Sequence, residues 1–491
     1  MNYLAFDLGG SSGKLLLAKI EDGKLKLQKV HQFPNQPLEE DGNLYWDIRS
    51  ISKNLKEGIK KAVELTGDDI SGFGADSFCN DHVLIDEKGE ILSPVFCYRD
   101  ARTTRNEEAF YQVMSRQELY SVNGNQNAVF NALNHIHAAK VENADYAYRV
   151  ADKMLFLSDY LLYELTGVKQ TEYTTASVSQ FFDYGKMDWS DLVMEKYGID
   201  RNILAPLSMP GNLTGKTSLE FNDTVGTKGF PVYTVCQHDT ASAFLASIGG
   251  EDSAIVSTGT WCLVGMEAEG PVIKQEGFEA NVANEGGYRG KHHRLLKNVM
   301  GTWIIQEMLR EYNLENEEMS FGELEKLAIE AGLQDHFIDV DAPEFFEPGN
   351  MFSKVCEGSN KLYGKSFQTI GETVAAVYES LAFKYRMTME TLERLTGTSL
   401  KVINMIGGGI NSEMMCQLTA NICGRKVIAG PEDAASLGNI ITQMVASGEI
   451  PDIEAGRDLI RNTIEIKEYY PDGNPLWEEH YKEFCSLLAN K

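Results

Sequence analysis

A strand, a polar glycine turn and a second strand occur twice in this chain, and this repeat constrains the fold more than any other feature. The apolar run 3–7 is followed by the turn 9–13 and by a second apolar run at 15–18. Residues 254–265 repeat the pattern around Gly259. Glycine permits the tight turns that join paired strands. The repeat therefore predicts two similar halves, each beginning with a hairpin.

Helix-like and strand-like segments alternate after each hairpin. Apolar residues recur at spacings of three and four over 51–65 and again over 374–395, which is typical of amphipathic helices. Gly397 directly follows the second stripe and predicts its end. A short apolar run at 402–406 indicates a buried strand. The alternation predicts an α/β fold.

Composition is consistent with two large lobes, residues 1–245 and 246–491, in a folded protein. The chain has 491 residues, 43% of them hydrophobic, and a net charge of −27. Without a basic block, this acidity argues against nucleic acid as a partner. No apolar run reaches the ~18 residues of a membrane helix. The eight cysteines are scattered without a C-x-x-C pair, which favours a reduced, cytoplasmic setting over a zinc site.

The two turns are candidate phosphate sites. Backbone amides and Ser or Thr hydroxyls at 9–13 and 257–261 can bind anionic oxygens, although each alone is more often a simple hairpin. As a pair, they can clamp one polyphosphate. Asp7 ends the first strand, where it can hold Mg²⁺ directly or through water. The run 407–409 would let an adenine lie close to the backbone. These spacings predict a nucleotide in an interlobe cleft.

Two further segments are candidates for chemistry. An apolar strand at 232–235 leads to His238 and Asp239, and phosphoryl transfer needs an Asp that accepts a hydroxyl proton. Alternatively, Asp239 caps a helix over 240–248. Arg99 and Asp100 follow another apolar run and are either a structural ion pair or polar groups for a sugar.

Together these segments resemble the FGGY carbohydrate kinases over nearly the whole length of the chain. The motifs that carry the resemblance are Asp7-Leu8-Gly9-Gly10-Ser11-Ser12-Gly13-Lys14, Tyr98-Arg99-Asp100-Ala101-Arg102-Thr103, His238-Asp239-Thr240-Ala241-Ser242-Ala243, Ser257-Thr258-Gly259-Thr260-Trp261, Asn284-Glu285-Gly286-Gly287, Leu296-Lys297-Asn298-Val299-Met300-Gly301, Gly407-Gly408-Gly409 with Gln417, Ala429-Gly430-Pro431 and Leu437-Gly438-Asn439.

The resemblance implies a fold, an activity and partners. The fold is two ribonuclease-H-like lobes, as in actin-like ATPases, with the active site in the cleft between them. The activity is ATP- and Mg²⁺-dependent phosphorylation of a ketose at a terminal hydroxyl, and the similarity is greatest to members that act on L-rhamnulose at O1. Other ketoses, such as L-fuculose, L-ribulose or D-xylulose, are the first alternative. A sugar sensor or an actin-like ATPase that is not a kinase is the second. Dimers are common among relatives, so the resemblance implies a monomer or a homodimer.

The resemblance also implies residue roles. Asp239 is the general base, and Asp7 is the metal residue. ATP-binding positions are Gly10, Ser11, Ser12, Gly13, Lys14, Gly259, Thr260, Gln306 and Gly408. Sugar-binding positions are Asp76, Cys79, Arg99, His238, Thr240 and Asn298.

This sequence departs from the family pattern near the expected sugar site. Lys14 stands where the family usually has Arg, and Cys79 stands where it has Gly. Asn80, His82, Asn125 and Asn127 occupy apolar positions of the family pattern. One hypothesis is a substrate with more hydroxyls than a 6-deoxyketose. The other is drift in surface-facing residues around an unchanged pocket. Buried polar groups without partners are costly, so we expect these side chains to have partners.

Overall fold

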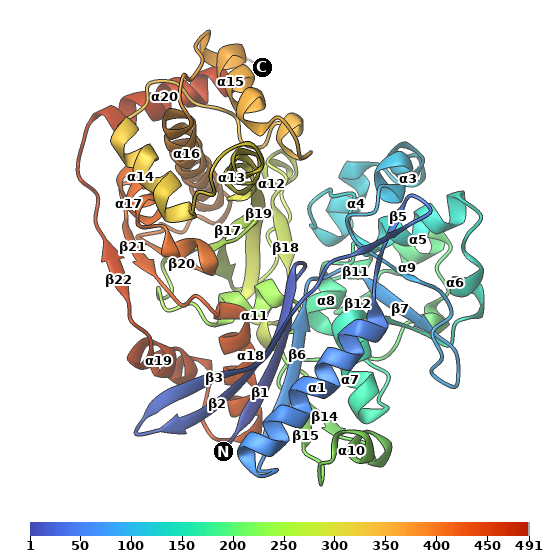
Figure 1. Cartoon of the computed structure of the whole chain (residues 1–491). Coiled ribbons are helices and arrows are strands. Elements are labelled where there is room, and N and C mark those ends of the chain that lie inside the picture. Colours follow the sequence, from blue (N-terminus) through green and yellow to red (C-terminus); the bar gives the residue numbers. More distant parts are fainter. Residues whose placement is uncertain (490–491) are drawn as a thin grey trace. The chain divides into compact units, whose positions relative to one another are not determined.

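The structure is a computed structural model that describes residues 1–489 (Figure 1). The chain forms two compact units that do not coincide with two continuous stretches of sequence. Unit 1 comprises residues 1–246, 267–295 and 434–463. Unit 2 comprises residues 247–266, 296–433 and 464–489.

Unit 1 is built on a mixed sheet in which the first strand is central. β1 (Tyr3–Leu8) pairs antiparallel with β2 and parallel with β6. Every residue of β1 is buried, as expected for a strand covered on both faces. The order of the sheet is β14 (Leu213–Lys216), β15 (Pro231–Tyr233), β6 (Gly72–Ser77), β1, β2 (Ser12–Glu21) and β3 (Lys24–Pro34). The predicted N-terminal hairpin is confirmed.

The predicted first helix is also confirmed, as α1 (Ile48–Thr66). The Asp47 carboxylate accepts from the Ser50 amide at its start, and Gly67 ends it in the left-handed region at φ 63°. Its buried face carries Ile51, Leu55 and Ile59 and joins the core of the sheet. The apolar spacing in the sequence therefore predicted correctly which face of α1 packs against the sheet.

A helix from late in the chain completes unit 1. α18 (Ala434–Ser447) packs against β1, β6 and α11 (Asp239–Leu245) (Figure 1). A Cβ at Gly438 would lie 1.8 Å from the Ser242 carbonyl oxygen, so only glycine permits this approach. The contact places a helix from beyond residue 430 under the strand ends of the N-terminal sheet.

Smaller elements make up the rest of unit 1. Its short strands are β4 (Leu38–Glu40), β5 (Asn43–Trp46), β7 (His82–Ile85), β8 (Val95–Phe96), β9 (Lys153–Phe156), β10 (Thr171–Glu172), β11 (Phe182–Asp183), β12 (Asp188–Trp189), β13 (Leu207–Ser208) and β18 (Ala283–Glu285). Its other helices are α2 (Arg102–Arg105), α3 (Glu107–Val113), α4 (Arg116–Asn123), α5 (Ala132–Val141), α6 (Tyr146–Val150), α7 (Leu157–Thr166), α8 (Tyr173–Ser177), α9 (Asp191–Tyr197), α10 (Leu219–Val225), α12 (Gln275–Glu279) and α19 (Ile453–Thr463).

Unit 2 repeats the same plan. β16 (Ser253–Thr258) pairs antiparallel with β17 (Trp261–Ala268) and parallel with β20 (Val402–Ile406). β21 (Lys426–Ala429) and β22 (Lys467–Tyr469) continue beyond β20. β19 (His293–Met300), like β17, runs from one unit into the other along the chain. The predicted second hairpin and the buried strand at 402–406 are confirmed.

Long helices cover this second sheet. α16 (Ile370–Thr396) begins at a capping box of Thr369 and Glu372 and ends at Gly397, as the sequence predicts. The other helices are α13 (Trp303–Glu315), α14 (Phe321–Ala331), α15 (Met351–Tyr363), α17 (Glu413–Cys423) and α20 (Leu476–Ala489). No helix in the described part of the chain is long and apolar enough to cross a membrane. All eight cysteines are free thiols.

Candidate active site

Three carboxylates gather where strands of unit 1 end. Asp7 and Asp76 are opposite each other in the parallel pairing of β1 with β6. Asp239 is the first residue of α11, shortly after β15, the other neighbour of β6. Partial burial and the nearby Asp7 charge raise the pKa of Asp239 to about 7. Burial and Asp7 also raise the pKa of Asp76 well above its ordinary value. The structure thus brings the predicted base and the predicted metal residue together.

Two side chains of α18 donate hydrogen bonds to two of these carboxylates. The Ser436 hydroxyl donates to Asp7 Oδ2 at 2.9 Å, and the Asn439 amide donates to Asp76 Oδ2 at 2.7 Å. Lys14 Nζ lies 3.4 Å from the same Asp7 oxygen. Our sequence reasoning gave no role to Ser436 or Asn439. The available signal was a pair of polar residues spaced three apart on a largely apolar helix, where both are fully buried.

The first turn has little room for side chains. A Cβ at Gly10 would meet the Tyr98 hydroxyl at 3.0 Å and Arg99 Nη2 at 3.4 Å. A Cβ at Gly13 would lie 2.3 Å from the Phe33 ring. The exposed guanidinium of Arg99, which donates from Nε to Tyr98, therefore sits beside the turn. Ser11 and Ser12 complete the turn, and Asn35 closes it by donating to the Gly9 carbonyl at 2.8 Å.

Asp100 has a structural role and is not the partner of Arg99. Its carboxylate accepts from the backbone amides of Leu44, at 2.6 Å, and of Arg102, at 2.8 Å. Its side chain is buried, whereas Arg99 is exposed. The structural ion pair considered as one alternative is therefore wrong for these two described residues, and Arg99 is left as a cation next to Gly10.

The alternative role of Asp239 as a helix cap is also wrong. The residue at the cap position of α11 is His238, and no side chain makes a cap bond there. Asp239 Oδ1 instead accepts from the amide of Thr240 at 2.5 Å and from its hydroxyl at 3.2 Å. Thr240 thus contacts the predicted base directly.

Burial and the neighbouring Arg294 keep His238 neutral. Arg294 Nη1 lies 2.8 Å from Glu285 Oε2, and Arg294 Nη2 donates to His238 Nδ1 at 3.2 Å. Burial and the Arg294 charge lower the pKa of His238 well below its usual range. Because Nδ1 accepts, Nε2 carries the proton and faces Asp239 Oδ1 at 3.5 Å. Glu285 belongs to a motif quoted above, but neither it nor Arg294 received a role from sequence alone.

Cys79 lies in the same electrostatic environment. Burial, then the charges of Glu285 and Asp239, raise the pKa of its thiol well above the ordinary value, so it stays protonated. The next residue, Asn80, donates to the sulfur at 3.2 Å. Asn80 adopts a left-handed backbone at φ 77°, which Asn tolerates better than most residues. Its side-chain oxygen accepts from the Ala132 amide at the start of α5.

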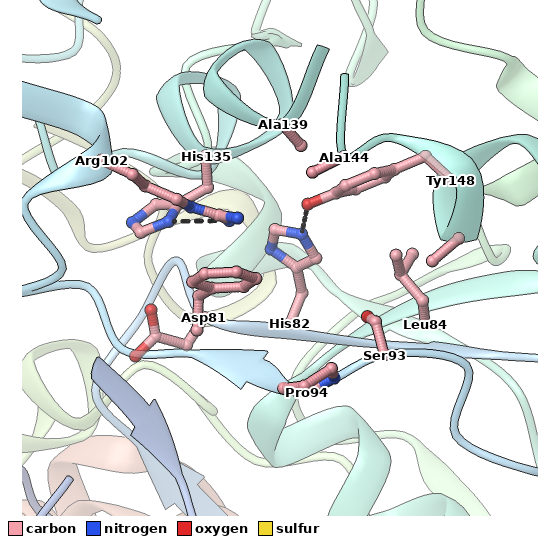
Figure 2. Close-up of a pocket in the computed structure, with 12 residues that line it drawn as sticks. Asp81, His82, Leu84, Ser93, Pro94, Arg102, His135, Ala139, Ala144 and Tyr148 are labelled. Carbon is pink, nitrogen blue, oxygen red and sulfur yellow. Dashed lines mark hydrogen bonds between the residues drawn. The ribbon is translucent and has the colours of Figure 1, made fainter. Parts of the chain in front are cut away.

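Asn80 and His82, the latter drawn in Figure 2, are buried, so the drift hypothesis is wrong in taking these two residues to face the surface. His82 Nε2 lies 2.7 Å from the Tyr148 hydroxyl, beside a cavity of about 30 Å³ that Arg102 and His135 also line. Burial lowers the pKa of His82 to about 4 and keeps it neutral. Asn80 is only 2% exposed. As expected, these polar groups have protein partners.

The second polar pair also has partners inside unit 1. The Asn125 amide donates to the Asn284 carbonyl at 2.7 Å. The Asn127 backbone amide donates to Asn281 Oδ1 at 2.9 Å. Asn125 is buried, so it too does not face solvent. The predicted side-chain partner therefore exists for the Asn125 amide. The contact of Asn127 is made by its backbone, and among the described residues Asn125 Oδ1 and Asn127 Oδ1 are buried without a hydrogen-bond partner, so the prediction is wrong for these two oxygens.

In unit 2, the hydrogen bonds of the second turn join neutral groups. Thr260 Oγ1 lies 3.5 Å from Gln306 Oε1, so the structure brings these two predicted ATP residues together. The Gly259 carbonyl accepts from the Thr302 hydroxyl at 2.9 Å. A Cβ at Gly301 would lie 2.5 Å from that same carbonyl oxygen. Close backbone packing therefore shapes this turn.

The glycine run after β20 packs against the same turn. Gly407 has a left-handed φ of 85°, and a Cβ there would lie 2.6 Å from the Thr258 carbonyl oxygen. Gly408 begins a 3-10 turn and has open space where a Cβ would be. Asn298 is half-buried on β19 in this unit, so the structure does not bring it into one unit with His238.

The carboxylates of unit 1 do not form a protein metal cage. Among the described residues, no group of three or more His, Cys, Asp or Glu side chains is arranged to hold a metal ion. Mg²⁺ in phosphoryl-transfer sites usually binds one or two carboxylates, waters and substrate phosphates. Asp7, a single carboxylate beside the phosphate turn, fits that mode of binding.

Known proteins share the fold of this chain. Solved structures with the same fold include a xylulose kinase from Lactobacillus acidophilus, with a TM-score of 0.83, 15% identity and coverage of 100% of this chain and 98% of that one. A Plasmodium falciparum glycerol kinase with ADP aligns at a TM-score of 0.80, with 15% identity and coverage of 100% and 98%. The fold defines an actin-like, ribonuclease-H-like protein with two lobes, as predicted.

Sequence relationships identify the family. Residues 2–246 match the N-terminal domain of the FGGY family of carbohydrate kinases, and residues 254–447 match its C-terminal domain. A rhamnulokinase from Bacteroides thetaiotaomicron is 33% identical over 489 residues, or 99% of each chain. One from Bacillus subtilis is 33% identical over 472 residues, or 96% of each. This chain belongs to the FGGY family of carbohydrate kinases.

Proposed function

We propose that this chain transfers the γ-phosphoryl group of ATP to a terminal hydroxyl of a ketose, and that the ketose is L-rhamnulose. The observation that carries the proposal is the placement of Asp239 at the start of α11, among Asp7, Asp76 and a neutral His238. The identity with two rhamnulokinases supports the choice of sugar.

Asp239 is the general base in this proposal. A carboxylate whose pKa is near 7 can take a proton from a sugar hydroxyl as the new bond to phosphorus forms. His238 directs its Nε2 proton toward Asp239 Oδ1 and so favours the ionised form. Thr240 donates to the same oxygen and fixes the orientation of the carboxylate.

The first turn receives the phosphates. Its small residues, Gly10 to Gly13, let oxygens approach the backbone amides, while Lys14 and Arg99 supply positive charge at its edge. Asp7 would hold Mg²⁺, which neutralises phosphate charge when it is bound. Ser436 keeps the Asp7 carboxylate in place. This cluster performs the electrostatic part of the transfer.

The turn of unit 2 takes the nucleotide. Thr260 and Gln306 provide hydroxyl and amide groups, and Gly408 offers an open backbone surface for a flat base. Among sugar contacts we propose Asp76, Cys79, His238, Thr240 and Asn298. The protonated Cys79 thiol lies in the electrostatic environment of Asp239 and adds bulk at a position where the family has Gly.

A coupled assay of ADP release with MgATP tests the proposal. The panel contains L-rhamnulose, L-fuculose, L- and D-ribulose, D- and L-xylulose, D-fructose and glycerol. We expect the highest kcat/KM with L-rhamnulose. A clear preference for another ketose would overturn the sugar and keep the kinase. ATP hydrolysis that no sugar stimulates would overturn the kinase and favour an actin-like ATPase.

A further inference from the structure

Two polar side chains hold the backbone that leads to Asp239. We propose that Glu172 and Thr174 are positioning residues that fix the amides of Gln237 and His238, so that the Asp239 carboxylate stays where the sugar hydroxyl reacts. The proposal rests on the proposed function, because it takes Asp239 as the base.

The contacts join two distant parts of the sequence. Glu172 Oε2 accepts from the Gln237 amide at 3.2 Å, across 65 residues. The Thr174 hydroxyl accepts from the His238 amide at 3.2 Å and donates to Glu172 Oε2 at 2.6 Å. The two consecutive amides before Asp239 therefore both bind this pair. Glu172 and Thr174 are both 0% exposed.

A second buried carboxylate strengthens the arrangement. Asp159 Oδ1 accepts from the Glu172 amide at 3.0 Å and from the Gln237 side-chain amide at 2.8 Å. Asp159 is 0% exposed. Burial and then the charge of Glu172 raise the pKa of Asp159 well above its ordinary value. A buried carboxyl group needs hydrogen-bond partners, and here the Glu172 backbone and the Gln237 side chain supply them, so that Asp159 ties these two residues together.

The carbonyl groups of residues 236 and 237 are also hydrogen-bonded. The Gln237 carbonyl accepts from the Ser77 amide at 2.9 Å, next to the end of β6. The Ser242 hydroxyl donates to the Cys236 carbonyl at 2.7 Å. Hydrogen bonds therefore constrain residues 236–238 on both sides, immediately before Asp239, and Thr240 then orients the Asp239 carboxylate.

Local helix capping does not explain the whole arrangement. Glu172 caps α8 by accepting from the amides of Thr174 and Thr175. A cap needs only those bonds. The bonds to Gln237 and His238 leave the helix and reach the segment of the predicted base. They distinguish a positioning role from ordinary helix stabilisation.

Three variants separate the two roles. Thr174→Val keeps the shape of the side chain but removes the acceptor for the His238 amide, whereas Thr174→Ser keeps the hydroxyl. Thr175→Val is the matched control, because among the described residues the Thr175 hydroxyl binds the Glu172 carbonyl alone, at 2.8 Å. Thermal unfolding of each variant is measured alongside steady-state kinetics with MgATP and the best sugar of the panel.

We expect Thr174→Val to lower kcat by ~10- to 100-fold, because small displacements of reacting groups are costly. The KM values for sugar and ATP should change less than threefold, and Thr174→Ser should restore kcat. Equal losses of kcat in Thr174→Val and Thr175→Val would show that both losses come from destabilisation of α8. That result would overturn the proposal. So would a Thr174→Val enzyme with normal kcat.

Asp239→Asn is measured in parallel, so that the two proposals fail in different ways. Near-normal kcat in Asp239→Asn would overturn the base and, with it, the positioning role. An inactive Asp239→Asn together with a fully active Thr174→Val would overturn the positioning role alone.

Discussion

The two turns that begin the units have the same backbone plan but different chemistry. The turn after β1 lies among charged groups: Asp7 ends its strand, Lys14 pairs with that carboxylate, and Arg99 lies beside Gly10. In the turn after β16, the side-chain hydrogen bonds of the described residues 258–260 join neutral groups, such as Thr260 with Gln306. Repetition of the fold has therefore preserved the hairpin and not its electrostatics.

The difference separates two tasks. In the proposed function, phosphoryl transfer requires charge at the reacting atoms, and the turn of unit 1 carries charged groups. Recognition of a flat base requires close approach of the backbone, and the glycines around Thr258 in unit 2 leave room for it in the proposal. Substitutions that change charge should therefore act mainly on kcat in unit 1, and substitutions that add volume should act mainly on nucleotide affinity in unit 2.

The largest effect is expected from Asp239→Asn. The amide keeps the size of the side chain but cannot accept the hydroxyl proton, so kcat should fall by ~10²- to 10⁴-fold. Binding of ATP and sugar, measured by calorimetry, should change little. The exposed Asp223→Asn is the matched control and should retain full activity. A kcat within threefold of wild type would show that Asp239, the charged candidate in unit 1, is not the general base.

Sequence reasoning found the residues whose type is unusual for their position, and it missed those that work through distant contacts. Asp239 was recognisable because an acid follows an apolar strand, although the same pattern also suggested a cap. Ser436 and Glu172 were not recognisable, since their partners are 429 and 65 residues away. Asn80 and His82 were noticed as departures, but only the packing shows that their partners are protein groups.

The pH dependence should show the second largest effect. Asp239 must be ionised to act, and partial burial together with the Asp7 charge places its pKa at about 7. The value of kcat/KM for sugar should therefore rise with pH through about 7 and fall ~10-fold per unit below it. Asp7→Asn removes one cause of the raised pKa of Asp239. The pH below which kcat/KM falls should therefore move to a lower value. A profile that is flat from pH 5 to 8 would contradict the assignment.

The glycine run of unit 2 offers a sharper test of the neutral turn. Gly407→Ala places a Cβ against the Thr258 carbonyl in a left-handed conformation, and we expect a loss of about 2–4 kcal/mol in the free energy of unfolding. Gly408→Ala meets open space, so its stability should be unchanged. If adenine lies on Gly408, the KM for ATP should rise on the order of tenfold. An unchanged KM would remove Gly408 from the site.

The smallest effect should come from the buried cluster around His82 (Figure 2), which carries polarity in unit 1 without contacting Asp239 in the described structure. His82→Phe removes the bonds of the imidazole to the Tyr148 hydroxyl and to the Asn80 carbonyl and should destabilise the protein by about 1–3 kcal/mol in urea unfolding. Tyr148→Phe alone should cost less, and the double variant less than the sum, because both variants lose the same His82–Tyr148 bond. The ranking of sugars should stay the same in all three variants. If His82→Phe changes that ranking, the cluster takes part in substrate choice. In that case the specificity of unit 1 would depend on buried polar groups as well as on the charged turn after β1.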